Sequence, residues 1–453
     1  MMMKQYKNLR TLIVGILLSF STVSFGQIES LSKEQMIADI DTLFSTIEQV
    51  HPDMYAVYPK QQLDNEIERV KSELEPNGDI FYLYKQIAPL VVKLGDGHTG
   101  VGCPSKYLKN VPNLFPFSVK VTYPDRIVRV QNDYTQTQNT IPVGAQIISI
   151  NNRQATDIVQ DMMNYASGEK DFFKAEWLEG LFTPLIYILY GDTIFSIEYQ
   201  FNQQKYSAHA KGISFKERYE NVQQTDNMSD KWYSFSTLPD KNIGIIEFNS
   251  FNDLDKFKVF LDSTFQVLQK ENIENLIIDI RKNSGGNSAL GDELLQYISP
   301  VPFNQFGKSI VKYSDIVKQF YKTYMNMEFS NPNGIEIEED ELIELKEEHL
   351  RYRGNVYLLI SHSSFSSAAD FSWAFKYFKV GTIIGEETGG MVVCFGDIIH
   401  LELPHSKLFY CCSWKKFYGY GATDENIHGT FPDYEIEADK ALDFAIDLII
   451  NQN

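Results

Sequence analysis

Three short segments of the chain carry residue types that could do chemistry. The first, Gly-Asp-Gly-His-Thr-Gly at residues 95–100, holds His98 in a glycine-rich turn where little side-chain bulk shields the imidazole. Its letters satisfy GxGxxG, but a dinucleotide site also needs a helix directly after the glycines and an acid about 20 residues on. Here Val-Gly-Cys-Pro follows, which breaks any helix. A nucleotide loop is therefore excluded, and His98 is either a structural loop residue or a candidate base.

The second segment is a pair of glycines, Gly285 and Gly286, between a predicted buried strand and a predicted helix. Without Cβ atoms, their backbone N–H groups could face an anion or a developing oxyanion. A tight turn that requires positive φ explains the pair equally well.

The third segment, residues 363–371, is rich in serine and follows another predicted strand. Ser367 is either the N-cap of a helix or a nucleophile raised on the strand-to-helix turn, with the N–H of Ala368 as an oxyanion donor. A serine needs an adjacent base to attack at neutral pH. His98 is the candidate base, and only the fold could bring these two residues together.

The C-terminal half must position the glycine and serine segments. Apolar, β-branched runs alternate with helical patterns there, which is the βαβ signature of an α/β core. The expected strands are 243–248, 276–280, 356–360 and 382–384, and the expected helices are 252–270, 287–298 and 367–379. Residues 336–348 hold eight acids, and we expect a solvated helix face rather than a metal or partner site.

The N-terminal part is expected to be helical. Ser32 and Gln35 form a capping box, and apolar residues then recur at helical spacing until Pro52. Further helical stretches are expected at 61–74 and at 80–94, the latter kinked at Pro89.

Residues 113–215 alternate apolar and polar side chains over short runs, which predicts strands. The stretch 141–152, followed by a helix-like 155–163, resembles part of a PDZ domain, a module that captures extended peptide ends by strand addition. A plain β-rich connector is the alternative.

Composition limits the classes of function. The chain has 453 residues, a net charge of −19 and 43% hydrophobic residues, so it is neither disordered nor suited to nucleic acid. Four cysteines are too few for a disulfide scaffold. The sequence contains no CxxC or HExxH motif that would suggest a metal site. In an oxidising compartment the cysteines could pair, in a connectivity that the sequence does not reveal.

Residues 1–26 have the order of a secretory signal peptide: three basic residues, an apolar run at 12–25, and small residues before a cleavage point near Gly26. A retained anchor is the alternative, but the run is shorter than the roughly 20 residues that a span needs. We expect an exported protein, periplasmic or extracellular, without stable membrane insertion after cleavage.

The three segments, in this order, resemble the C-terminal-processing (tail-specific) serine peptidase family. The resemblance extends to residues 385–390 and 429–433 and spans most of 90–435. It implies a crotonase-like (ClpP/crotonase-type) α/β peptidase core with an N-terminal helical module and a PDZ-like β-rich module. The implied divisions are a signal peptide (1–26), the helical module (27–105), the PDZ-like module (106–225) and the peptidase core (226–453).

One departure from the family pattern matters. Members with a Ser–Lys dyad carry a lysine where this chain has Met391, and no lysine occurs between Lys379 and Lys407. The chain resembles instead the tricorn-like branch, in which a histidine is the base and a late acid supports it. The resemblance implies that Ser367 is the nucleophile and His98 the base. Glu425 would support the base, with Asp424 as its competitor. Ala368, together with Gly285 or Gly286, would supply the oxyanion N–H groups.

These features predict an exported serine endopeptidase that acts on polypeptides and needs no metal or cofactor. The alternative is a non-catalytic protein on the same fold that binds a lipid or peptide ligand. A weaker third hypothesis, an envelope interaction protein that uses residues 336–348, rests on charge alone.

Overall fold

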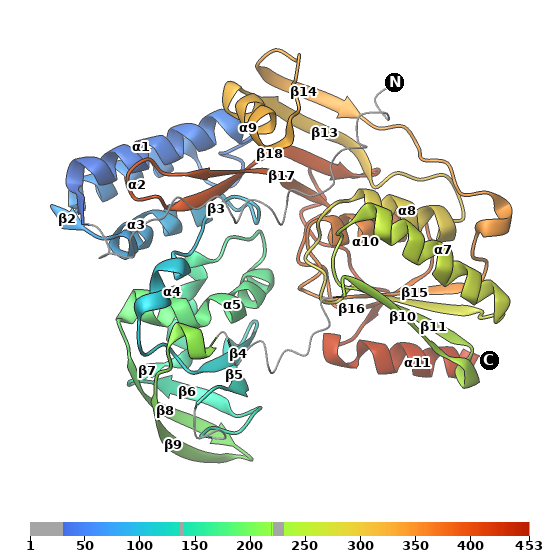
Figure 1. Cartoon of the computed structure of the whole chain (residues 1–453), viewed down its shortest axis with the longest axis horizontal. Coiled ribbons are helices and arrows are strands. Elements are labelled where there is room, and N and C mark those ends of the chain that lie inside the picture. Colours follow the sequence, from blue (N-terminus) through green and yellow to red (C-terminus); the bar gives the residue numbers. More distant parts are fainter. Residues whose placement is uncertain (1–29, 136–139, 219, 221–230, 453) are drawn as a thin grey trace.

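The computed structural model describes residues 30–135, 140–218, 220 and 231–452. The predicted signal peptide therefore lies outside the described residues. The rest is a mixed α/β protein with three large sheets, flanked by helices (Figure 1). No helix among these residues is both long and apolar enough to cross a membrane.

The N-terminal part is helical, as predicted. It comprises α1 (Lys33–Val50), α2 (Lys60–Glu73) and α3 (Ile80–Val92), with a short pairing of β1 (Leu31–Ser32) and β2 (Asn77–Gly78). The capping box is present: Ser32 Oγ accepts from Gln35 N–H at 3.3 Å, and Gln35 Oε1 accepts from Ser32 N–H at 2.9 Å. Pro89 lies inside α3, as expected.

A β-rich part follows. Its antiparallel sheet has the order β4-β5-β6-β8-β9, with β7 beside β6. The strands are β4 (Phe117–Thr122), β5 (Ile127–Asp133), β6 (Gln146–Ile150), β7 (Arg153–Gln154), β8 (Ile194–Phe201) and β9 (Gln204–Lys211), and the helices are α4 (Ala155–Met162) and α5 (Asp171–Tyr190). The sequence did not predict α5. Its twenty residues carry apolar side chains on every side, so the helical period is hidden.

The C-terminal half contains a six-stranded sheet with the order β10-β11-β12-β15-β16-β19, parallel from β11 to β19. Its strands are β10 (Tyr233–Leu238), β11 (Ile243–Phe248), β12 (Asn275–Asp279), β15 (Asn355–Ile360), β16 (Thr382–Gly385) and β19 (Tyr434–Glu435). The predicted βαβ alternation is confirmed.

Helices cover both faces of this sheet (Figure 1). Ile246, Ile278 and Leu358 pack against α7 (Leu254–Lys270), α8 (Ala289–Ile298) and α10 (Ser367–Tyr377). Their neighbours Ile245, Ile277 and Leu359 pack against α11 (Ala441–Gln452). Buried residues on both faces explain why these strands are apolar throughout rather than alternating.

The third sheet is antiparallel, with the order β14-β13-β18-β17, and β3 pairs with β18. It is built from β3 (Gly100–Val101), β13 (Phe306–Tyr313), β14 (Gly334–Glu339), β17 (Val393–Glu402) and β18 (Phe409–Gly419). The predicted acidic helix at 336–348 is wrong, because residues 336–339 lie in the edge strand β14 and no α-helix forms there. The segment is largely exposed, as expected, and α9 (Asp315–Met325) precedes it.

One hydrophobic core joins parts of the chain that are far apart in sequence. Met36 and Ile40 of α1 and Phe117 of β4 belong to the same buried cluster as Val311 and Trp414 of the antiparallel sheet. Because β18 also pairs with β3, the N-terminal helices are fixed against the C-terminal half. All four cysteines are free thiols, so the disulfide pairing that the sequence left open is not present.

Candidate active site

The glycine and serine segments meet at the carboxyl edge of the six-stranded sheet. Strands β12 and β15 are parallel neighbours, with Asp279 opposite Leu359. The chain therefore leaves both strands at the same edge, into the glycine loop and into the serine loop. Phe365 N–H donates to Asn283 C=O at 3.1 Å, which ties the two loops together.

Other serines of the segment serve as anchors. Ser361 Oγ donates to Arg281 C=O at 2.5 Å, and Ser364 Oγ donates to Ile280 C=O at 2.9 Å. Ser363 Oγ donates to Glu176 of α5 at 2.8 Å. The bonds of Ser361 and Ser364 fix the loop on the end of β12.

Ser367 is the first residue of α10 and follows a strained residue. Ser366 has φ 53° and ψ −131°, a conformation that costs a non-glycine residue of order 1–3 kcal/mol. The turn places the Ser367 side chain over the glycine loop, where its Oγ donates to Gly286 C=O at 2.8 Å. In this state the hydroxyl is bonded to a backbone carbonyl rather than to a base, and Ser367 is 4% exposed.

The predicted oxyanion donors differ in their availability. Gly285 N–H donates to Asn283 Oδ1 at 2.8 Å, and Ala368 N–H donates to Phe365 C=O at 3.1 Å. The N–H of Gly286 donates to no acceptor in the described part of the chain. The flanking groups, Gly285 C=O and Asn287 N–H, both bond to Phe251, so the N–H and C=O of Gly286 are directed away from Phe251.

The loop that carries His98 is held by Asp96. This carboxylate is buried and accepts from His98 N–H at 2.8 Å and from Ser413 Oγ at 2.7 Å. His51 Nε2 lies 3.2 Å from Asp96 Oδ2, the oxygen that also accepts from Ser413, and Asp53 N–H donates to His51 Nδ1 at 3.1 Å. His51 therefore donates through Nε2.

Three segments thus meet at Asp96: its own loop with His98, the residue His51 that follows α1, and Ser413 in β18. Burial by itself would raise the pKa of Asp96, but the hydrogen bond from His51 and the charges of His51 and His98 outweigh it and lower the pKa to about 2. Asp96 is ionised in the folded protein and orders the loop around His98.

The imidazole of His98 lies beside the serine loop. It stacks on Phe365, two residues before Ser367, with ring centroids 4.5 Å apart and planes 25° apart. Phe365 stacks in turn on Phe173 of α5 at 4.1 Å. The structure therefore brings the early histidine segment and the serine segment together, as the sequence required.

Burial lowers the pKa of His98, while the charges of Asp96 and Asp397 oppose that shift. The imidazole is therefore neutral near pH 7 and able to accept a proton. Its Nδ1 atom is buried and has no hydrogen-bond partner among the described residues, although Asp96 Oδ1 lies 3.9 Å away.

Sequence reasoning missed a carboxyl group at this site, that of Glu169. Its Oε1 accepts from Gly97 N–H at 3.1 Å, and its Oε2 is buried without a partner in the described part of the protein. One ligand atom each from Asp96, His98 and Glu169 lie within 4.8 Å of one another. Glu169 lies in an unremarkable turn before α5, so no local pattern signalled its position.

These three residues would be the ones to hold a cation. Both oxygens of Asp96 are already bonded to protein donors, however. We therefore assign no metal to this cluster.

The predicted supporting acid and its competitor make local contacts in this structure. Glu425 is exposed on a turn where its N–H donates to Thr423 Oγ1 at 3.3 Å. No hydrogen bond or ion pair between Glu425 and His98 occurs in the described ranges. Its competitor Asp424 pairs with Lys416 at 2.9 Å and accepts from Tyr418 at 2.7 Å. In this state neither acid is brought to the imidazole, and the role of Glu425 stays a prediction.

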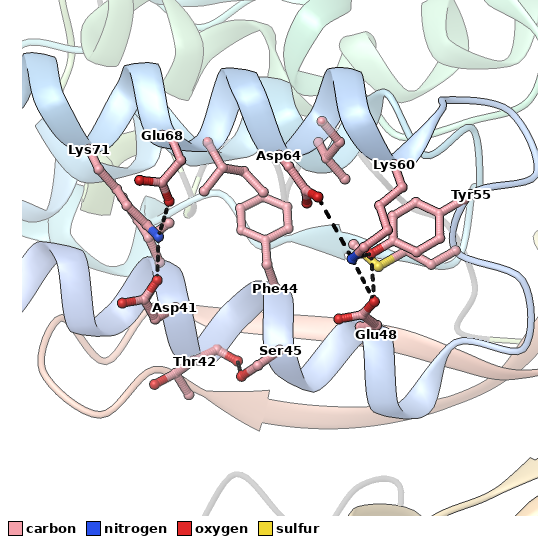
Figure 2. Close-up of a pocket in the computed structure, with 14 residues that line it drawn as sticks. Asp41, Thr42, Phe44, Ser45, Glu48, Tyr55, Lys60, Asp64, Glu68 and Lys71 are labelled. Carbon is pink, nitrogen blue, oxygen red and sulfur yellow. Dashed lines mark hydrogen bonds and ion pairs between the residues drawn. The ribbon is translucent and has the colours of Figure 1, made fainter.

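A pocket of about 450 Å³ lies between α1 and α2, away from these residues (Figure 2). Lys71 bridges Asp41 and Glu68 at one end, and Lys60 pairs with Glu48 at the other. The lysines are neutralised by their partners, and the lining residues offer no nucleophile beside a base. This pocket is not the candidate active site.

Residues 242–436 match the sequence model of peptidase family S41. The match contains the glycine and serine segments and confirms the family resemblance drawn from the motifs. His98 and Glu169 lie outside the matched residues.

Solved structures with a similar fold include mature CPAF, which is 14% identical, with 93% of this chain and 98% of that chain covered and a TM-score of 0.63. Mature CPAF in complex with lactacystin is also 14% identical, with 93% and 97% covered and a TM-score of 0.62. A serine-to-alanine variant of CPAF is 13% identical, with 92% and 96% covered and a TM-score of 0.64. At this identity the likeness concerns the fold, and it extends over nearly the whole chain.

Proposed function

We propose that this serine-type peptidase, whose residues 242–436 match the model of peptidase family S41, cleaves polypeptides with Ser367 as nucleophile and His98 as general base. The observation that carries the proposal is the meeting of the two segments. His98 stacks on Phe365, and Ser367 stands two residues further on, at the start of α10.

In the proposed reaction, Ser367 Oγ attacks the peptide carbonyl while its proton passes to the neutral imidazole of His98. The imidazolium then returns this proton to the leaving amine, and water hydrolyses the acyl-enzyme. The low pKa of His98 favours the neutral form that the first step needs. Before attack, the Ser367 hydroxyl has to leave Gly286 C=O and turn to the imidazole.

For the oxyanion hole we propose the N–H of Gly286, which has no other acceptor in the described structure. Gly285 and Ala368, the other predicted donors, would first have to release Asn283 and Phe365. Because a preorganised donor needs no such rearrangement, Gly286 is the better candidate.

We further propose that the sheet from β4 to β9 is the PDZ-like module and that the core has the crotonase-like fold. The edge strand β9 pairs with β8 on one side, and its outer backbone could accept an extended polypeptide by strand addition. The divisions at 27–105, 106–225 and 226–453 and the cleaved signal peptide belong to the same proposal, with a periplasmic or extracellular location. The shared core around Met36 and Trp414 crosses these divisions.

The comparisons give no support to a non-catalytic ligand carrier. A direct test is the hydrolysis of casein by purified wild type, Ser367→Ala, His98→Ala and Ser363→Ala. Ser363 is the matched control, because it lies in the same loop and bonds to Glu176. We expect Ser367→Ala to lower kcat at least about 10⁴-fold, His98→Ala to lower it strongly, and Ser363→Ala to stay near wild type.

Equal activity in all four proteins would contradict the proposal and identify a contaminant. Lactacystin, which is bound to CPAF in one solved structure, provides a second probe. We expect it to inhibit the wild type.

A further inference from the structure

Glu169 lies beside the proposed base but has no role in the reaction described so far. It is carried by the turn between α4 and α5, in the β-rich part, and reaches the histidine loop, where Gly97 N–H donates to its Oε1. A Cβ added to Gly97 would lie 2.9 Å from Glu169 Oε2, so the carboxyl group packs directly on the residue before His98.

Two polar atoms at this contact are left without partners. His98 Nδ1 and Glu169 Oε2 are both buried, and neither makes a hydrogen bond with any described residue. Leaving such a buried polar atom unpaired is unfavourable, because its bonds to water are lost without replacement. A single proton held between an imidazole nitrogen and a carboxylate oxygen would satisfy both atoms.

We propose that Glu169 is the positioning carboxylate of His98: it accepts the Nδ1–H of the imidazole and leaves Nε2 with the lone pair that takes the proton of Ser367. This inference rests on the proposed function. When the O–H bond of Ser367 breaks, the proton moves to Nε2, and the Nδ1–H stays with the imidazolium. Glu169 remains ionised through the step and stabilises the positive charge.

Other carboxylates near His98 are less suited to this role. Asp96 Oδ1 lies 3.9 Å from Nδ1, but it already accepts from His98 N–H, while Oδ2 accepts from Ser413 and faces His51. Asp397 acts on His98 only through its charge. Glu425 is exposed on a turn, where its N–H donates to Thr423. Among the described carboxyl groups near His98, Glu169 has the buried oxygen that lacks a hydrogen-bond partner.

The ionisation of Glu169 gives the proposal a distinctive pH dependence. Burial and the charge of Asp96 raise the pKa of Glu169 to about 8, although the hydrogen bond from Gly97 N–H and the charge of Lys174 lower it in part. Cys394 also faces this group, and its own thiol is held neutral by burial. Below about pH 8, protonated Glu169 donates to His98 Nδ1 and favours the tautomer with hydrogen on Nε2. In that tautomer Nε2 cannot accept the proton of Ser367. Activity should therefore rise as the pH passes about 8.

The test compares kcat, KM and the pH profile of wild type, Glu169→Gln, Glu169→Asp, Glu425→Gln and Glu176→Gln. Glu176 is the matched control, since it also contacts the serine loop but not the imidazole. We expect Glu169→Gln to lower kcat by about 10²–10⁴-fold with KM changed far less, and to lose the rise near pH 8. Glu169→Asp should restore part of kcat, and Glu176→Gln should stay within about threefold of wild type.

Wild-type kcat with an unchanged profile in Glu169→Gln would overturn the proposal, as would a larger loss in Glu425→Gln than in Glu169→Gln. A readout without turnover separates this inference from the proposed function. Nitrogen-15 NMR of the histidine rings, with His98 assigned by substitution, should show protonated Nδ1 at pH 9 in both wild type and Ser367→Ala. Unprotonated Nδ1 at that pH would contradict the role of Glu169, whether or not casein is cleaved.

Discussion

Surroundings distinguish the proposed catalytic residues from similar residues nearby. Several serines lie in one loop, but Ser361 and Ser364 are bonded to the end of β12, whereas Ser367 follows a strained turn. Likewise His51 donates to Asp96, while Nδ1 of His98 has no hydrogen-bond partner among the described residues. Residues of one type carry the same reactive group, and their hydrogen bonds determine which of them is able to react.

Asp96 gives the first prediction at the residue scale. Asp96→Asn replaces an acceptor oxygen with an NH₂ group that faces donors, and it removes the charge that His51 needs. Breaking a buried pair of this kind should lower the free energy of unfolding by about 3 kcal/mol. Urea denaturation at pH 7 measures the change. The control is Glu73→Gln, which removes one partner of the exposed pair with Arg69 and should leave the stability near that of wild type. A variant as stable as wild type would contradict the anchoring role of Asp96.

The sequence was informative about His98 and Ser367 because each sits in a short motif with its own backbone requirement. It was silent about Glu169, because a contact between a turn before α5 and the loop at Gly97 depends on tertiary packing over 72 positions. The position of Glu425 was inferred from motif order, and the structure places that side chain on an exposed turn. Motifs predict residues that act through local geometry better than residues that act across the fold.

At the scale of elements, the site depends on the carboxyl ends of β12 and β15. Parallel pairing brings two loops to one edge, and the bonds of Phe251 to Gly285 and Asn287 direct the middle glycine toward Ser367. The same pairing leaves no room for a side chain. A Cβ at Gly286 would lie 2.4 Å from Phe251 C=O, and its φ is +139°.

Gly286→Ala should therefore displace the loop and the proposed oxyanion donor. We expect kcat to fall by about 10²–10³-fold, the typical cost of one donor, with the far-UV circular dichroism unchanged. The matched control is Gly180→Ala inside α5, where a Cβ meets no atom within 4 Å. That change should stabilise the protein by about 0.5–1 kcal/mol without loss of activity. Full activity in Gly286→Ala would exclude this loop from the oxyanion hole.

Elements with a clear period or a cap were predicted well. The Ser32 capping box begins α1, and the buried strands 243–248 and 356–360 were found almost residue for residue. Two failures have physical reasons. Helix α5 is apolar on all sides, and isoleucine alternates with glutamate over residues 335–338, which suits the exposed edge strand β14.

For the whole molecule, one core unites the N-terminal helices, the β-rich sheet and the antiparallel sheet. The candidate site gathers residues from all of these regions and from the parallel sheet. Composition and periodicity predicted the kinds of module but not their packing, because long-range contacts leave no local pattern. Removing the N-terminal helices would therefore expose the core and take away His51, the hydrogen-bond partner of Asp96.

Buried carboxyls make the stability of the whole molecule depend on pH. Burial, the main cause in each case, raises the pKa of Glu169 and Asp370 to about 8, of Glu179 to about 7 and of Asp292 to about 6. The folded state therefore holds protons that the unfolded state releases at lower pH, so rising pH destabilises the fold. The lowered pKa of His98 has the opposite effect, but only below its ordinary value of 6.5.

We expect Tm to fall steadily between pH 6 and pH 8, measured by circular dichroism at constant ionic strength. Asp370→Asn removes one of these groups and should make the decline shallower. A Tm that is constant or rises over this interval would show that these carboxyls are ionised in the folded protein.

The central claim is that Ser367 is a nucleophile activated by His98. The most direct measurement is the site and rate of reaction with a fluorophosphonate, read by mass spectrometry of the peptide that contains residues 354–376. The account predicts a single adduct on Ser367, formed at least about 10²-fold more slowly in His98→Ala. A folded protein that remains unlabelled, or one labelled at another serine, would contradict it.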